Sequence, residues 1–242
     1  MTAARSLAFN LAFGLVTLAM GFIGLPLLLG RRTWVHAYGR IWARACMMLL
    51  KITVGLDWEV RGRPPTDAVL IAAKHQSAWE TLALILVVRN PAFVMKKALL
   101  WTPPFGPYLW KAGMIAIDRG SGAKAIRAMQ TAAADVIAEG RPIVVFPEGT
   151  RRAPGAPPDY KSGVAALYRG IGRPTAPVAL NSGQFWGRNA FAKRPGRIVL
   201  AFLEPIPPGL ERRTFMRRLE DEIETASTAL AEEAEQARRI VP

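Results

Sequence analysis

The chain has 242 residues, which is enough for one substantial domain with an appendage but too short for two large domains. Its 32 Lys and Arg residues against 18 Asp and Glu give a formal charge of +14, which predicts phosphate-rich partners such as anionic lipid or nucleic acid. The single cysteine, Cys46, excludes an intrachain disulfide and a thiolate metal cluster, and its apolar surroundings predict a buried side chain.

The N-terminal part of the chain is both basic and apolar. Residues 1–51 contain no acidic residue, and residues 6–30 contain no formally charged residue. A helix of that length spans roughly 35 Å, enough to cross a bilayer core. Its glycines and Pro26 would weaken or kink the helix, so an interfacial or re-entrant helix is one alternative and a cleaved signal peptide is another. The combination favours a membrane surface over nucleic acid.

Residues 33–52 predict a second, amphipathic helix that lies in the headgroup region of a membrane. Its apolar and aromatic residues recur at helical spacing: Trp34, Tyr38, Ile41, Trp42, Ala45, Met48 and Leu49. Basic residues take other positions, where they attract anionic lipid. His36 belongs to this helix, and we expect it at the interface rather than in catalysis. We therefore divide the chain into a membrane-binding helical segment, residues 1–51, and a domain formed by residues 52–242.

Patterns typical of strands and helices alternate in the second domain. Seven apolar stretches predict strands: ITVGLDWEV, AVLIAA, PAFVM, GMIAI, PIVVF, TAPVAL and RIVLAFL. Three stretches between them predict helices: SAWETLALILVV, GAKAIRAMQTAAADVIAE and KSGVAALYRG. A final amphipathic helix is predicted over residues 211–239. This order predicts an α/β fold with a mostly parallel sheet covered by helices, to which the N-terminal membrane-associated segment is added.

The stretch KHQSAWET, residues 74–81, follows a predicted strand and opens a helix. Ser77 and Glu80 have the spacing of a capping box, which explains the pattern without catalysis. The alternative is a catalytic pair, because His75 follows a strand where ligands bind in open α/β sheets, and imidazole takes up protons near neutral pH. A carboxylate one helical turn away can orient such a base, so we expect Glu80 to contact the other ring nitrogen.

Two further stretches carry polar groups at predicted strand ends. FPEGTRR, residues 146–152, contains a carboxylate, a hydroxyl and two guanidinium groups, of which Arg151 suits phosphate recognition. A turn with solvated arginines is the alternative. In residues 96–120, Lys97 and Arg119 flank an apolar, aromatic and Pro-rich segment. This segment predicts either one wall of a groove for an acyl chain or a hydrophobic loop that precedes a strand.

Four stretches of the sequence now form a pattern: HQSAWE, the segment from Lys97 to Arg119, FPEGTR and APVAL. In order and rough spacing they resemble the four motifs of the glycerolipid acyltransferase family, over about residues 70–182. The resemblance implies transfer of a fatty acyl group from acyl-CoA or acyl-carrier protein to the sn-2 hydroxyl of lysophosphatidic acid. The product, phosphatidic acid, enters phospholipid biosynthesis. The resemblance also implies a catalytic domain on the cytoplasmic side of the inner membrane, with the phospholipid bilayer as a partner and without a cofactor or metal.

The resemblance assigns roles to individual residues. His75 matches the general base, and Glu80 takes the position of the family's usual aspartate, with a side chain longer by one methylene. The basic residues match groups that hold the acceptor's phosphate, and Pro177 with Val178 matches a strand that shapes the acyl pocket. The expected substrate-binding residues are Lys97, Arg119, Glu148, Gly149, Thr150 and Arg151.

Other functions are compatible with parts of the sequence. The same chemistry could act on another lysolipid, such as lyso-ornithine lipid, and dependence on an acceptor phosphate separates the two. A membrane-tethered nucleic-acid-binding protein would use the positive charge, but the sequence contains no recognisable binding motif, so we expect no nucleic acid partner. A metal hydrolase is disfavoured because the chain has only two histidines, one of them in the predicted interfacial helix.

Overall fold

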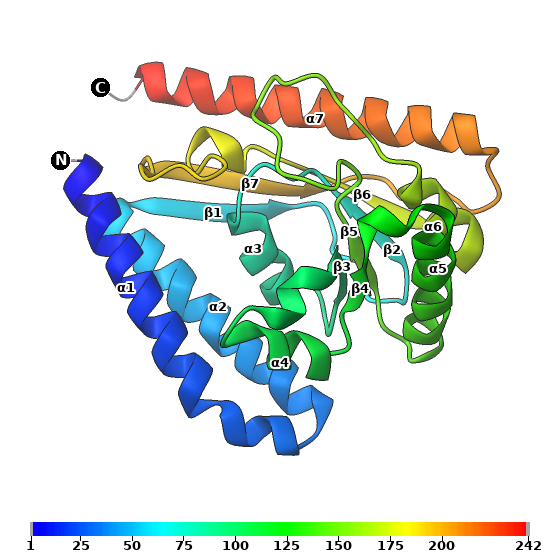
Figure 1. The fold of residues 1–242 in the computed structure, drawn as a ribbon. Coiled ribbons are helices and arrows are strands. Elements are labelled where there is room, and N and C mark those ends of the chain that lie inside the picture. The colour runs from blue at the N-terminus through cyan, green and yellow to red at the C-terminus, as the bar shows by residue number, and fades with distance from the viewer. Residues whose placement is uncertain (1, 241–242) are drawn as a thin grey trace.

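A seven-stranded sheet with the strand order β1-β7-β6-β2-β5-β3-β4 forms the centre of the structure (Figure 1). The structure is a computed structural model that describes residues 2–240, apart from the side chains of Arg119 and Ile240. The strands are β1 (Leu56–Arg61), β2 (Leu70–Ala73), β3 (Ala92–Lys96), β4 (Ile115–Ile117), β5 (Ile143–Val145), β6 (Thr175–Leu180) and β7 (Gly196–Phe202). Each pairing between these strands is parallel except that of β6 with β7. The predicted α/β fold with a mostly parallel sheet is confirmed.

Helices cover both faces of this sheet. On one face lie α2 (Arg32–Val54) and α3 (Trp79–Val87), and on the other lie α5 (Gly122–Ala138), α6 (Gly163–Ile171) and α7 (Arg212–Ile240). Side chains of a strand point alternately to the two faces. In β2, accordingly, Ile71 and Ala73 pack with the α2 and α3 side, whereas Leu70 and Ala72 pack with α5, α6 and α7.

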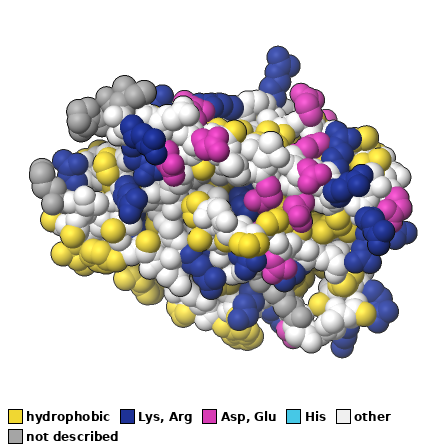
Figure 2. All heavy atoms as spheres, turned by 90° about the horizontal axis from the view of Figure 1, so that it is seen from above, with side chains coloured by type: hydrophobic (Ala, Val, Ile, Leu, Met, Phe, Trp, Pro, Cys, Tyr) yellow, Lys and Arg dark blue, Asp and Glu magenta, His cyan; other side chains and the backbone are white. Residues whose placement is uncertain are grey.

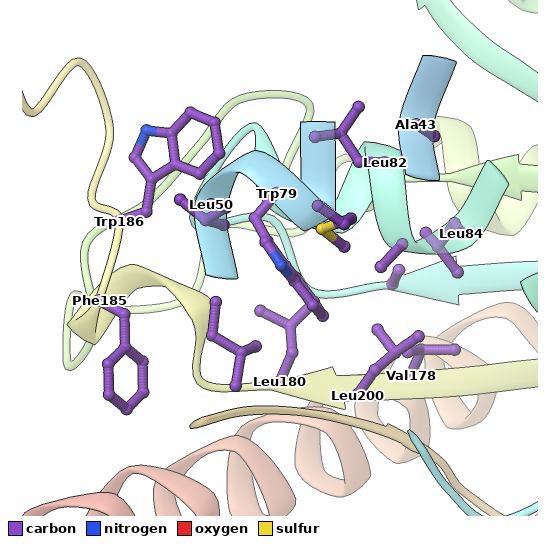
Figure 3. Close-up of a cluster of buried hydrophobic side chains, with 14 of the residues drawn as sticks. Ala43, Leu50, Trp79, Leu82, Leu84, Val178, Leu180, Phe185, Trp186 and Leu200 are labelled. Atoms are coloured by element: carbon purple, nitrogen blue, oxygen red, sulfur yellow. The ribbon is translucent and has the colours of Figure 1, made fainter. Parts of the chain in front are cut away.

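Helix α2 is part of the hydrophobic core of the domain. Its buried residues include Cys46 and Leu50, and Cys46 is buried as predicted. Figure 3 shows Leu50 and the fully buried Trp79 of α3 above Val178 and Leu180 of β6. The expected boundary at residue 51 therefore falls inside a helix that contributes to the core.

The end of α2 also corrects the predicted first strand. The stretch ITVGLDWEV was expected to be a strand throughout, but its first three residues complete the helix, which ends at Val54. Gly55 follows with φ of +77°, the left-handed conformation that glycine adopts at helix C-termini, and its N–H bonds back to the carbonyl of Lys51. The strand therefore begins only at Leu56.

The uncharged N-terminal run forms a helix and a turn. Helix α1 (Thr2–Ile23) ends before Pro26, and the 3₁₀ helix η1 (Leu25–Leu29) reverses the chain into α2. By length and composition alone, α1 is the one helix of the described chain that could cross a membrane. It also packs against the domain, because Phe9 is buried with its ring 5.3 Å from that of Trp186. Trp42 of α2 donates a hydrogen bond of 3.1 Å to Thr17.

His36 is buried, so its predicted interfacial position is wrong. Its Nε2 lies 3.1 Å from the carbonyl oxygen of Ala112 and 3.3 Å from Nη2 of Arg141. Burial, and then the charge of Arg141, lower the pKa of His36 to about 4, so the ring is neutral near pH 7. The periodicity was ambiguous because α2 has two apolar faces, and the face with His36 packs inward while Trp34, Ile41 and Met48 are exposed.

Candidate active site

The expected site residues lie at one edge of the sheet. Strands β2, β5, β3 and β4 run parallel to one another, so their carboxyl ends meet along the same edge. His75 follows β2, the FPEGTR segment follows β5, and Lys97 and Arg119 follow β3 and β4. Motifs from residues 74–152 therefore lie along the same edge of the sheet.

At the end of β2, His75 and Glu80 form a hydrogen-bonded pair. The distance between Nδ1 of His75 and Oε1 of Glu80 is 2.8 Å. The same oxygen accepts the backbone N–H groups of Gln76 at 2.8 Å and Ser77 at 2.6 Å, and Oγ of Ser77 accepts the N–H of Trp79 at 3.1 Å. Helix α3 begins at Trp79 with Ala78 as its N-cap, one residue later than the predicted capping box, but Ser77 and Glu80 still form hydrogen bonds at this helix start beside the expected histidine–carboxylate pair.

The pairing determines which nitrogen of His75 faces the surroundings. An ionised carboxylate only accepts hydrogen bonds, so Nδ1 carries the hydrogen, and in the neutral ring Nε2 keeps its lone pair. Within residues 2–240, no hydrogen bond to Nε2 is recorded. The ring stacks on Phe146 with 3.9 Å between centroids, and the side chain is 14% exposed. The ring of His75 is therefore oriented by Glu80 and partly exposed, and in its neutral form it can accept a proton at Nε2.

Ser182 is a residue of the site that sequence reasoning missed. It follows β6 in the 3₁₀ helix η4 (Ser182–Gln184), and its Oγ donates to Oε2 of Glu80 at 2.8 Å. Gly183 next to it donates its N–H to Oε1 of Gln76 at 2.9 Å. The polar NSG sequence directly after a buried strand was the available signal. Four donors thus fix the fully buried Glu80 carboxylate despite its longer side chain.

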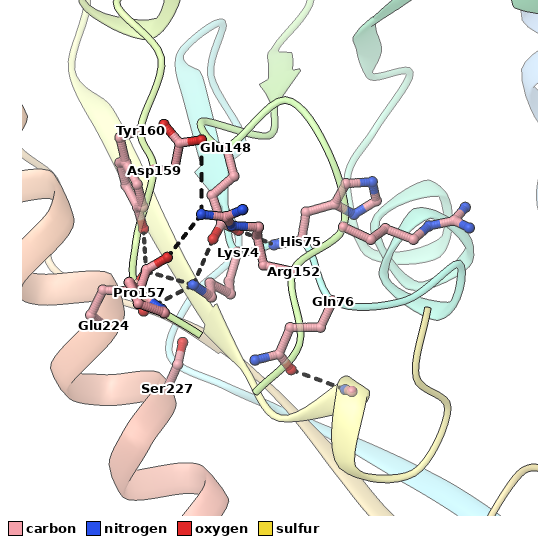
Figure 4. A network of polar contacts seen from close by, with 12 residues as sticks. Lys74, His75, Gln76, Glu148, Arg152, Pro157, Asp159, Tyr160, Glu224 and Ser227 are labelled. Carbon is pink, nitrogen blue, oxygen red and sulfur yellow. Dashed lines mark hydrogen bonds and ion pairs between the residues drawn. The ribbon is translucent and has the colours of Figure 1, made fainter. Parts of the chain in front are cut away.

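Glu148 of the FPEGTR segment is buried rather than open to a ligand (Figure 4). Its Oε1 accepts a hydrogen bond of 2.8 Å from Nζ of Lys74, and its Oε2 lies 3.4 Å from the backbone nitrogen of His75. Burial raises the pKa of Glu148, and Lys74 opposes that rise. Lys74, which sequence reasoning passed over, also contacts Glu224 of α7 at 2.7 Å. In this structure Glu148 is held by an internal ion pair, and its expected contact with a substrate stays a prediction.

The other expected binding residues occupy more accessible positions. Gly149, with φ of +67°, forms the turn after β5, and Thr150 is exposed. Arg151 is half-buried, and no described residue forms a recorded bond with its guanidinium group. Lys97 is exposed at the start of the 3₁₀ helix η2 (Lys97–Trp101). Arg119 begins the 3₁₀ helix η3 (Arg119–Ser121), and its side chain lies outside the described atoms.

An apolar cavity of about 110 Å³ lies between the N-terminal helices and α4 (Phe105–Lys111). Helix α4 belongs to the stretch expected to be either one wall of an acyl-chain groove or a hydrophobic loop, and it provides Phe105 and Tyr108 to the cavity wall. Neither the KHQSAWET nor the FPEGTR segment lines it. Pro177 and Val178 also do not line it, because they are buried in β6 beside β2.

Comparisons with known proteins agree with the motifs. A family model described as "Acyltransferase" matches residues 58–181. The chain is 35% identical over 159 residues to the 1-acyl-sn-glycerol-3-phosphate acyltransferase of Pseudomonas aeruginosa. This alignment covers 65% of this chain and 62% of that protein. It is 30% identical over 169 residues to the 1-acyl-sn-glycerol-3-phosphate acyltransferase alpha of Ovis aries, and this alignment covers 68% of this chain and 59% of that protein.

The fold is similar to a solved structure as well. The crystal structure of the 1-acyl-sn-glycerophosphate (LPA) acyltransferase, PlsC, from Thermotoga maritima matches with a TM-score of 0.78 at 22% identity, over 95% of this chain and 98% of that one. The matches to the curated relatives span about three fifths of those proteins' length. The family model covers just over half of this chain and includes both His75 with Glu80 and the FPEGTR segment. The chain belongs to the acyltransferase family.

Proposed function

We propose that this protein transfers a fatty acyl group from a thioester donor, acyl-CoA or acyl-carrier protein, to the sn-2 hydroxyl of lysophosphatidic acid. The product is phosphatidic acid. The observation that carries the proposal is the oriented pair of His75 and Glu80 at the strand edge that also bears Arg151. The names of the relatives, which are 1-acyl-sn-glycerol-3-phosphate acyltransferases, support the same reaction.

In the proposed mechanism, His75 acts as a general base through Nε2. It takes the proton of the acceptor hydroxyl while that oxygen attacks the thioester carbonyl. Collapse of the tetrahedral intermediate breaks the carbon–sulfur bond, and the imidazolium returns the proton to the leaving thiolate. The products are an ester and a free thiol, and His75 is neutral again. Glu80 holds Nδ1–H and stabilises the positive charge that the ring carries in between.

Basic side chains at the strand edge recognise the acceptor's phosphate in this proposal. A guanidinium group binds phosphate oxygens through two parallel hydrogen bonds, and the unpaired state of Arg151 within the described chain supports this role. Lys97 and Arg119 at neighbouring strand ends add positive charge. Gly149 and Thr150 shape the turn that carries Arg151, whereas Glu148 supports that turn from inside.

The apolar cavity beside α4 is the proposed place for part of an acyl chain. Its wall consists mainly of aromatic and aliphatic side chains, including Trp42, Phe105 and Met114. Such a lining favours a hydrocarbon over a polar ligand, because moving apolar surface out of water is favourable. The bound chain would contact both α2 and α4.

Membrane attachment through α1 and α2 completes the proposal. The outer face of α1 exposes large apolar side chains: Leu7, Leu11, Leu15, Leu18 and Phe22. In Figure 2, hydrophobic side chains gather on the side of the molecule that carries the N-terminus, whereas charged side chains are spread over the face around α7. Because Phe9 and Thr17 contact the domain, α1 would enter the bilayer from one side instead of leaving the domain to span it. We place the domain on the cytoplasmic face of the inner membrane.

Transfer of labelled acyl groups tests the proposal. The purified protein is given acyl-CoA or acyl-carrier protein as donor, together with lysophosphatidic acid or lysolipids that lack a phosphate. We expect a labelled phosphatidic acid product and its loss by a factor of about 10³ or more in His75→Ala. Near-normal turnover in that folded variant would contradict the base assignment. Equal activity toward an acceptor without phosphate, such as lyso-ornithine lipid, would contradict the acceptor assignment.

A further inference from the structure

Lys74 places a buried ammonium group between two carboxylates from distant parts of the chain. Its side chain is 3% exposed, and Nζ lies 2.8 Å from Oε1 of Glu148 and 2.7 Å from Oε1 of Glu224. Figure 4 shows Lys74 reaching from the end of β2 toward α7, where Glu224 lies. None of these three residues reacts in the mechanism proposed above, so their arrangement requires another explanation.

The electrostatics make Lys74 the link that keeps this cluster together. A charge in a buried position is costly unless it is paired and hydrogen-bonded. Here one ammonium group faces two carboxylates, and burial raises the pKa of Glu148. Glu220 lies four residues before Glu224 on the same helix, so the two carboxylates are neighbours, and burial and then the charge of Glu224 raise the pKa of Glu220. Without Lys74, these carboxylates would repel one another, so the ion pair fixes Glu148 relative to α7.

Glu148 and Glu224, the two carboxylates of the cluster, contact segments next to the candidate active site. Oε2 of Glu148 lies 3.4 Å from the backbone nitrogen of His75. On α7, Oε1 of Glu224 accepts a hydrogen bond of 2.9 Å from the hydroxyl of Tyr160, the last residue of the loop 151–160. Near the start of that loop, the N–H of Arg152 bonds to the carbonyl of His75 at 2.8 Å. The loop is thus tied to His75 at one end and to α7 at the other.

We propose that Glu224 is a positioning residue for the acceptor site. Through Lys74 it holds Glu148 and the FPEGTR turn, and through Tyr160 it holds the end of the loop 151–160. This inference rests on the proposed function, because that loop begins with Arg151, the proposed phosphate ligand. Helix α7 then belongs to the architecture of the active site and does more than cover the sheet.

The chain provides a matched control for the test. Glu222 lies on the same helix with a side chain 28% exposed, against 25% for Glu224, and it pairs with Arg218 at 2.7 Å and not with the cluster. Comparing Glu224→Ala with Glu222→Ala therefore separates the cluster from a general effect on α7. Glu224→Gln keeps an oxygen that can accept from Lys74 and Tyr160, so it should restore part of the wild-type behaviour.

Kinetics of the whole 242-residue chain in vesicles give the first measurement. In Glu224→Ala we expect the KM for lysophosphatidic acid to rise about 10-fold, with kcat much less affected, since the variant disturbs binding and not the base. Tyr160→Phe should raise the same KM about threefold. Glu222→Ala should leave both constants near wild type at a similar unfolding temperature.

Hydrogen exchange gives a second measurement that does not depend on activity. Peptides from residues 147–161 should exchange faster in Glu224→Ala than in the unmodified protein, and at the unmodified rate in Glu222→Ala. Equal exchange in the two variants overturns the inference, as does an unchanged KM in Glu224→Ala when the enzyme is active. If the unmodified protein is inactive toward lysophosphatidic acid, the proposed function fails, and the exchange comparison alone decides the role of Glu224.

Discussion

Replacing Glu80 with glutamine removes one negative charge beside the candidate base, His75, and changes little else. Three N–H donors converge on Oε1 of Glu80, from His75, Gln76 and Ser77. The amide of the variant must therefore place its oxygen there, and its NH₂ group faces the hydroxyl of Ser182, which can also accept. Glu80→Gln should thus keep the ring orientation and the Nδ1–H tautomer while the carboxylate charge is lost.

The contact distance sets the size of the expected effect. During transfer the ring of His75 becomes positive beside the Glu80 oxygen, which lies 2.8 Å from Nδ1. For charge centres about 4 Å apart and an effective dielectric constant of about 20, the attraction is about 4 kcal/mol. Because the amide dipole retains part of this attraction, we expect a loss of about 2 to 3 kcal/mol, which lowers kcat about 30- to 160-fold.

A thiol-release assay with an acyl-CoA donor measures this effect. The kcat and both KM values are determined for the wild-type enzyme and Glu80→Gln, and thermal unfolding verifies that the variant is folded. Ser182→Ala is the control, because it removes one neutral donor from Oε2 and leaves the charge, so kcat should fall only about 2- to 13-fold. A fall of less than threefold in Glu80→Gln would show that the charge is not needed. A loss as large as that of His75→Ala would show that the ring had changed its tautomer or orientation.

Three further predictions concern the phosphate site, the buried histidine and the membrane face. Arg151→Ala should raise the KM for lysophosphatidic acid about 10- to 150-fold with kcat nearly unchanged, and an unchanged KM would remove it from the site. Because the pKa of His36 is about 4 in the fold and 6.5 in the unfolded chain, the unfolded state binds more protons between these values. Stability should therefore fall by roughly 3 kcal/mol from pH 6.5 to pH 4, and urea unfolding of His36→Gln should show a smaller fall. Leu11 and Leu15 are 60% and 69% exposed, so changing either to serine should weaken co-sedimentation with anionic vesicles at least about tenfold without affecting the unfolding temperature.

Most elements of the fold could be predicted because their signals are local. Each of the seven strands coincides with an apolar stretch, and the glycine at position 55 explains the late start of β1. Helix α4 was missed because its seven residues lie in a Pro-rich aromatic segment without a clear period. The burial of His36 could not be predicted, since it depends on how α2 packs against Ala112 and Arg141.

The site residues that could be predicted are those in local contact, whereas those joined by tertiary contacts could not be. His75 and Glu80 are five residues apart, so a helix start alone brings them together, and their contact could be expected from spacing. Ser182 and Glu224 reach the site only through strand order and the path of α7 across the sheet. Lys74 adjoins His75 in sequence, but its role depends on those distant carboxylates. The catalytic roles themselves stay predictions that the variants above test.

Helix α2 is synthesised before the strands whose residues share its buried cluster. Cys46 and Leu50 lie on the inner face of α2, in a buried cluster that includes residues of strands β6 and β7, which leave the ribosome much later. Until then the nascent helix exposes apolar side chains on two faces, a state prone to aggregation. At the proposed membrane location, the bilayer surface shields this helix while the rest of the chain is made. The lipid would then assist folding before it supplies a substrate.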